Sequence, residues 1–189
     1  MPVVSFEHVD VIFGPNPAKA VEMLDQGLDR DEIFAKTENL VAVHDATLEV
    51  YEGQICVLMG LSGSGKSSLI RCVNGLNKIA RGKLKVRNGD QEVDLAACDW
   101  NTLHKLRTER ISMVFQQFAL MPWRTVRDNV ALGLELDGVP KDQRNQIVEE
   151  KLALVRLVEW ADKFQQPVYP MQLQCAMDQC LLQEERQLH

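Results

Sequence analysis

Glycine, lysine and serine residues between positions 60 and 67 have the types and spacing that bind phosphate groups. The segment from Gly60 to Ser67 matches the pattern G-x-x-x-x-G-K-[ST] at every fixed position. Gly63 and Gly65 lack a Cβ, so the backbone can adopt positive φ and bring its N–H groups close to phosphate oxygens. Lys66 is long enough to reach the β- and γ-phosphates of a nucleotide, and the Ser67 hydroxyl is a hard oxygen ligand for Mg²⁺.

The sequence therefore predicts a nucleoside triphosphate site with Mg²⁺ as its ion. The residues expected to bind the phosphates are Gly60, Leu61, Ser62, Gly63, Ser64, Gly65, Lys66, Ser67 and Ser68, and Ser67 is also an expected metal ligand. A guanine nucleotide would require an Asn-Lys-x-Asp motif on a later loop. The only Asn-Lys pair, Asn77-Lys78, is not followed by that Asp, which favours ATP.

The elements that flank this segment have the periods that a phosphate loop needs. Ile55–Met59 is a continuous apolar run between turn residues, which is typical of a strand buried on both faces of a sheet. From Ser67 onward the apolar residues have helical spacing, at Leu69, Ile70, Val73 and Leu76. The loop is thus expected to join a buried strand to a helix.

Further strands and helices are expected on both sides. Loose alternation predicts strands over 3–13 and 46–51, and Asn88-Gly89 predicts a hairpin between 83–87 and 91–95. Ile111–Phe115 is a second candidate for a buried strand. Helical periodicity extends over 18–39 and 141–162.

Composition limits the class of protein. The chain has 189 residues, about one domain by length, with 46% hydrophobic and 25% charged residues, as in an ordinary globular protein. The net charge of −6 argues against a nucleic-acid partner, which favours clustered Lys and Arg. The N-terminus does not resemble a secretory signal, and no run approaches the ~20 apolar residues of a membrane span. The five cysteines form no C-x-x-C pair and are expected to be free thiols.

Three stretches together resemble the ATP-binding cassette (ABC) family. They are residues 53–67, the Gly75-Leu76 and Arg81-Gly82 pairs with the hairpin that follows them, and residues 113–130. The resemblance covers about 40–164 and implies an α/β P-loop fold with an antiparallel N-terminal part, a partial helical subdomain and an incomplete sheet. By the same resemblance, Gln116 matches the family's Q-loop glutamine, which approaches bound Mg²⁺ and the attacking water.

The sequences of Met59–Lys66 and Phe118–Pro122, together with a long helical insert before residue 40, resemble those of ATPase subunits from importers of quaternary amines such as glycine betaine, proline or choline. That resemblance implies an ATPase subunit that pairs with a second copy beneath two transmembrane permease subunits, served indirectly by a substrate-binding protein. Its expected location is cytoplasmic, peripheral on the inner face of the cell membrane.

The expected domains are a nucleotide-binding domain over 1–164 and a Gln-rich tail over 165–189. Within the former, the P-loop core spans about 40–116, and the Q-loop with the helical subdomain spans about 116–164. The family's Leu-Ser-Gly-Gly signature, its strand ending in Asp-Glu and its switch histidine have no match here. We therefore expect a product truncated or frame-shifted after about residue 164, and we assign no catalytic residue.

The sequence is also compatible with two other functions, and it does not identify the residue that contacts adenine. The chain could be a non-catalytic ATP-binding fragment, or a P-loop kinase, although the Gln116 segment disfavours the kinase. The family places an adenine-stacking aromatic about eight residues before the position of Asp45, where this chain has Thr37, and Phe34 is the nearest aromatic. The residue that stacks on adenine is therefore not predicted.

Overall fold

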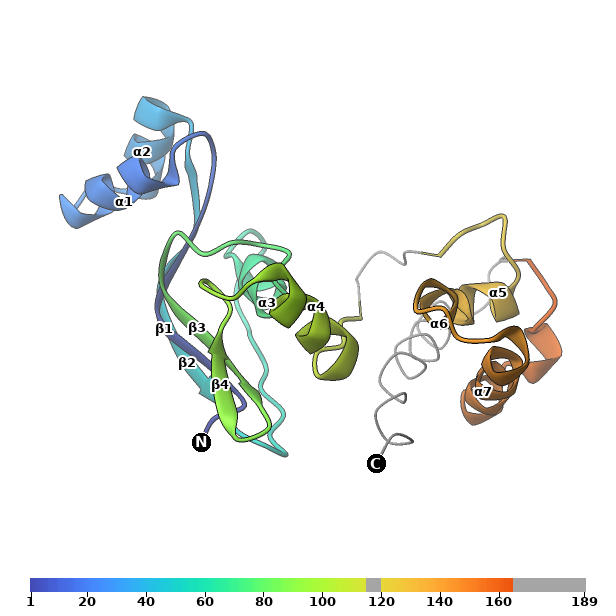
Figure 1. The fold of residues 1–189 in the computed structure, drawn as a ribbon. Helices are drawn as coiled ribbons and strands as arrows, with labels where there is room; N and C mark the ends of the chain where they lie inside the picture. Colours follow the sequence, from blue (N-terminus) through green and yellow to red (C-terminus); the bar gives the residue numbers. More distant parts are fainter. Residues whose placement is uncertain (115–119, 165–189) are drawn as a thin grey trace. The chain divides into compact units, whose positions relative to one another are not determined.

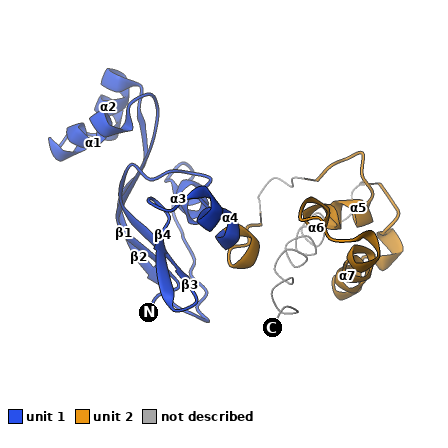
Figure 2. Ribbon diagram, viewed as in Figure 1, with its two compact units in different colours: residues 1–106 blue, residues 107–189 orange. Residues whose placement is uncertain are grey.

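The computed structural model describes residues 1–114 and 120–164, and it divides the chain into two compact units. The first unit comprises residues 1–106 and the second residues 107–189 (Figure 2). Helix α4 (Trp100–Glu109) includes the boundary between them. Each unit has buried clusters of its own and is described separately.

The first unit is built on a four-stranded antiparallel sheet (Figure 1). Its strands are β1 (Val4–Phe13), β2 (Leu40–Val50), β3 (Arg81–Asn88) and β4 (Gln91–Asp94), in the order β2-β1-β3-β4. The predicted hairpin is confirmed, because β3 and β4 pair directly on either side of Gly89. The strand expected over 46–51 is longer than predicted and begins at Leu40.

The insert between β1 and β2 forms two helices, α1 (Pro17–Asp25) and α2 (Arg30–Thr37), beyond one end of the sheet (Figure 1). Gly27, with φ of +84°, separates them, so the single helical region expected over 18–39 is interrupted. A capping box between Asp29 and Glu32 begins α2 by satisfying two backbone N–H groups. The insert and the strands share a buried cluster of Ile12, Ala20, Ile33 and Val41.

Helix α3 (Lys66–Val73) packs on the sheet through one apolar face. Its buried residues Leu69 and Cys72 belong to a cluster that also contains Phe6, Val9, Val11, Val43 and Leu84. Burial of such side chains contributes about 1.5–3 kcal/mol each. These contacts hold α3 against β1 and β2. They therefore fix the end of the loop at residues 60–65 that precedes the helix.

The prediction of a buried strand over Ile55–Met59 is wrong for this structure. No strand forms there, and Ile55, Val57 and Met59 expose 94%, 68% and 87% of their surfaces. Cys56, which lies in the same apolar run, is exposed as well. An apolar run indicates a preference for burial, but a strand also needs a neighbour to accept its backbone hydrogen bonds. Among the described residues none pairs with this run.

The second predicted buried strand is also not observed. Residues 111–114 have no strand structure, and Phe115 lies outside the described residues. Val114 exposes about half of its surface. The physical reason is the same, because no described strand offers this segment a partner.

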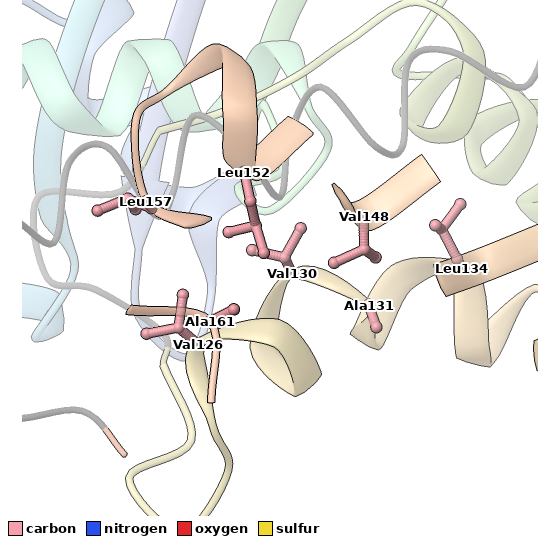
Figure 3. Packing of buried hydrophobic residues seen from close by; sticks show 8 residues of the cluster. All are labelled: Val126, Val130, Ala131, Leu134, Val148, Leu152, Leu157 and Ala161. Atoms are coloured by element: carbon pink, nitrogen blue, oxygen red, sulfur yellow. The ribbon is translucent and has the colours of Figure 1, made fainter. Parts of the chain in front are cut away.

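The second unit is helical, with α5 (Val126–Val130), α6 (Leu132–Leu136), α7 (Lys141–Leu154) and a short 3₁₀ turn (Val158–Trp160). The helix expected over 141–162 thus ends early, before Arg156, whose φ of +60° reverses the chain. Figure 3 shows the apolar core between these helices, formed by Val126, Val130, Ala131, Leu134, Val148, Leu152, Leu157 and Ala161. Within the described part of the chain, no helix has the length and apolar character needed to cross a membrane.

Candidate functional site

The phosphate loop predicted from sequence forms a compact turn in the first unit, ahead of α3. Gly60, Gly63 and Gly65 have φ of +155°, +81° and +87°, values that residues with a Cβ rarely adopt. A Cβ on Gly65 would lie 2.2 Å from the carbonyl oxygen of Ala42 in β2. Glycine is therefore required at position 65 by both its backbone conformation and its surroundings.

Lys66 folds back across this loop. Its Nζ donates to the carbonyl oxygens of Gly60 at 2.9 Å and Leu61 at 2.7 Å, and to the Ser64 hydroxyl at 3.1 Å. These bonds bring the ammonium group and the loop backbone together. The positive charge of the site is therefore concentrated where the loop turns.

The first turn of α3 supplies the remaining predicted groups. Gly65 is its N-cap, and the Leu69 N–H donates to the Gly65 carbonyl at 2.9 Å. The first N–H groups of a helix have no partner within the helix, and its dipole favours an anion at this end. Ser67 is exposed in this turn, and the Ser68 carbonyl accepts from Asn77 Nδ2 at 2.9 Å.

The donor set fits magnesium bound together with a triphosphate. A hydroxyl oxygen matches a hard cation whose other ligands are phosphate oxygens and water, whereas the ammonium and backbone N–H groups match the phosphate oxygens themselves. Across residues 1–114 and 120–164, no group of three or more His, Cys, Asp or Glu is arranged to hold a metal alone. Ser67, a predicted metal ligand, is exposed at the start of α3, and Gln116, the other predicted ligand, lies outside the described residues.

Phe13 is an exposed aromatic residue at the end of β1 that the sequence pattern did not single out. Thr37 stands where the family has an adenine-stacking aromatic residue. It is the last residue of α2, and its hydroxyl donates to the Ile33 carbonyl. Phe13 ends β1 and pairs with Leu40, two residues before Ala42, whose carbonyl faces Gly65. Phe13 is 39% exposed. Its place at the end of a predicted strand, directly before a Gly-Pro break, was the available signal.

The thiol of α3 is buried against the sheet. Cys72 lies on the buried face of α3, and burial raises its pKa to about 11. The thiol is therefore protonated at neutral pH, and it donates to the Ser68 carbonyl at 3.2 Å. The described cysteines Cys56, Cys72 and Cys98 are free, as predicted.

Comparison with known proteins matches most of this chain to one family. The model of the family described as "ABC transporter" matches residues 43–179, which extends beyond the boundary predicted at residue 164. The glycine betaine transport ATP-binding protein OpuAA of Bacillus subtilis is 43% identical over 176 residues, 93% of this chain and 40% of that protein. The glycine betaine/proline betaine transport system ATP-binding protein ProV of Escherichia coli is 40% identical over 153 residues, 81% of this chain and 37% of that protein.

The fold of this chain is similar to that of a solved structure from the same family. The dimeric structure of MJ0796, a bacterial ABC transporter cassette, has a TM-score of 0.70 and 23% identity, and covers 96% of this chain and 70% of that one. At this identity the likeness concerns the fold alone. The chain spans about 40% of the length of the curated relatives that it matches.

Proposed function

Since this chain belongs to the ABC transporter family, we propose that it binds ATP with Mg²⁺ at residues 60–68 and that the whole protein uses the nucleotide to drive import. The observation that carries the proposal is the loop itself, with three glycines at positive φ and the Lys66 ammonium gathered at the start of α3. Lys66 would bind the β- and γ-phosphates, backbone N–H groups would bind phosphate oxygens, and Ser67 would bind the metal.

The substrate that we propose is a quaternary amine of the glycine betaine, proline betaine or choline type. Two of the relatives are named as glycine betaine or glycine betaine/proline betaine transport proteins. We further propose that the chain works as a pair beneath two permease subunits on the inner face of the cell membrane, with a substrate-binding protein delivering the amine. The proposed domain limits are those of the sequence analysis, with the P-loop core over about 40–116 and the helical subdomain over about 116–164.

Phe13 is our candidate for the adenine contact. It is an exposed aromatic on the strand pair that supports Gly65, and aromatic faces stack on bases with about 1–3 kcal/mol per base. Gln116 is proposed to approach Mg²⁺ and the attacking water. The role of Phe13 is proposed from its place on β1, and that of Gln116 from the resemblance of residues 113–130 to the family's Q-loop segment.

The proposal is tested on the full chain by equilibrium binding of labelled ATP in the presence of Mg²⁺. Lys66→Ala is expected to weaken binding about 10- to 100-fold, the range for loss of charge-assisted hydrogen bonds. Lys36→Ala, which removes an exposed lysine from α2, is the control and should leave the affinity unchanged. Equal affinities of wild type and Lys66→Ala would contradict the proposed site.

A second assay decides between a working ATPase and the alternative of ATP binding without turnover. Phosphate release is measured with the permease subunits present. Multiple turnover that Lys66→Ala abolishes supports the ATPase, whereas bound ATP without phosphate release supports the non-catalytic alternative. Phosphate transfer to a small acceptor would instead favour a kinase.

A further inference from the structure

Asp10 is a buried carboxylate in the middle of β1 that joins three strands. It is 0% exposed. Its Oδ1 accepts from the backbone N–H of Asp45 at 2.8 Å and from Nδ1 of His44 at 3.0 Å, both in β2. Its Oδ2 lies 2.7 Å from Nε of Arg81, the first residue of β3, as an ion pair without linear hydrogen-bond geometry.

Arg81 extends this network to the helical insert. Its second contact is an ion pair with Asp25, the last residue of α1. The hydrogen bond to Asp25, together with the charge of Asp10, raises the pKa of the guanidinium, which therefore stays charged. A buried carboxylate is stable only with such partners, because removing one of them leaves an uncompensated charge.

The network lies where β1 and β2 depart from regular pairing. The register of the two strands shifts between Phe6 and Val9 and again between Val9 and Val11. His8 and Asp45 have φ of +51° and +52°, a conformation that costs a residue with a Cβ about 1–3 kcal/mol and persists only when neighbours impose it. The bond from the Asp45 N–H to Asp10 is one such restraint, and a bond between Asp45 Oδ1 and His8 Nδ1 at 2.7 Å is another.

This irregular part of β2 is adjacent to the residues that support the phosphate loop. The Ala42 carbonyl and the Val43 side chain are the groups nearest to Gly65, at 2.2 and 2.9 Å from the position of a Cβ. His44 and Asp45, the two partners of Asp10 in β2, follow immediately in the chain. The part of β2 that Asp10 contacts is therefore continuous with the part that contacts Gly65.

We propose that Asp10 is a positioning residue for the phosphate loop: with His44 and Arg81 it fixes the bulged segment of β2 that supports Gly65. Asp10 acts on ATP through this support and does not touch the nucleotide. The inference rests on the proposed function for its effect on ATP, but its effect on the loop is measurable without any nucleotide.

The test compares Asp10→Asn with Glu7→Gln in the full chain. Glu7 is also on β1 and pairs with Lys85 of β3 at 2.7 Å, so its variant also removes one cross-strand ion pair, away from residues 42–45. Two quantities are measured well below the unfolding temperature of each variant. One is hydrogen exchange of the peptide covering residues 65–73 without nucleotide, and the other is the Kd for Mg-ATP.

Asp10→Asn is expected to speed exchange over 65–73 and to raise the Kd about tenfold, within the range by which residues outside a site alter binding. Glu7→Gln should change neither. Arg81→Lys keeps the charge but loses the fork that contacts both Asp10 and Asp25, so an intermediate effect is expected. If Asp10→Asn does not fold, His44→Ala, which removes one donor at a half-exposed site, should shift both quantities in the same direction by about threefold.

The outcomes separate the two proposals. A purely structural role would lower the unfolding temperature of Asp10→Asn while exchange over 65–73 and the Kd stay equal to those of Glu7→Gln, and this result would overturn the inference. If wild type fails to bind ATP but exchange over 65–73 still accelerates in Asp10→Asn, the proposed function is wrong and the support of the loop by Asp10 stands.

Discussion

At the scale of single residues, Gly65 has the most demanding position in the site. Gly65→Ala would place a Cβ 2.2 Å from the Ala42 carbonyl at φ of +87°, so either β2 or the loop must move. We expect a loss of about 1–3 kcal/mol in the free energy of unfolding and at least a tenfold weaker affinity for Mg-ATP. Urea denaturation and ATP titration measure the two effects.

Gly89→Ala is the control for this prediction. Gly89 also has positive φ, +63°, but a Cβ there meets nothing within 4 Å. Its cost should be about 1 kcal/mol of stability, with unchanged ATP affinity. Similar ATP affinities for the two variants would show that the contact between Gly65 and β2 has no part in binding.

At the scale of elements, Asn129 fixes the turn that leads into α5. It is fully buried, its Nδ2 donates to the carbonyls of Met121, Arg124 and Thr125 at 3.1, 3.3 and 2.9 Å, and its Oδ1 accepts from Met121 N–H at 2.8 Å. Asn129→Asp keeps the shape but replaces the donors by an acceptor. We expect the second unit to lose about 2–4 kcal/mol of stability, measured by denaturation followed through tryptophan fluorescence.

Asn145→Asp makes the same chemical change at an exposed position of α7. It should alter stability by less than about 0.5 kcal/mol. A comparable loss in both variants would mean that the charge itself, and not the buried hydrogen bonds of Asn129, causes the effect.

Elements with local signals were predictable, and those that depend on distant partners were not. The hairpin at Gly89 follows from turn residues and alternation within a dozen positions, and the structure confirms it. Ile55–Met59 carries an equally clear apolar signal but forms no strand, because pairing depends on residues elsewhere in the chain. The break of the insert at Gly27 was visible only as a glycine within a helical pattern.

At the scale of the whole molecule, ATP binding should appear as added stability. A ligand present at 100 times its Kd stabilises the folded state by about 2.7 kcal/mol. We expect Mg-ATP to raise the unfolding temperature of the chain in a concentration-dependent way, and differential scanning calorimetry measures the shift. Lys66→Ala, whose affinity should be about 10- to 100-fold weaker, should show a clearly smaller shift at the same concentrations, about 0.4–1.4 kcal/mol of stabilisation. An equal shift in both proteins would place the nucleotide away from the loop.

The family was predictable from the sequence because it is carried by short local motifs, each of which can be read without knowledge of the fold. The surroundings of the loop were not. That Ala42 supports Gly65, and that Asp10 organises residues 42–45, depend on the register of β1 with β2, which periodicity does not specify at a bulge. The support that β1 and β2 give to the loop can therefore be inferred from the structure but not from the sequence.

The three hydrogen bonds of Lys66 to its own loop have a consequence for affinity. A phosphate that approaches the ammonium competes with the Gly60 and Leu61 carbonyls and with the Ser64 hydroxyl for the same protons. The free energy of binding is then the difference between the hydrogen bonds that Lys66 makes to the ligand and those that it makes to the loop. A ligand binds favourably only if it supplies more or better acceptors than the loop already offers. A triphosphate meets that condition more fully than a monophosphate. Breaking the internal bonds of the lysine would thus cost the same for every phosphate ligand, and the additional acceptors of a triphosphate would offset that cost more fully than those of a monophosphate.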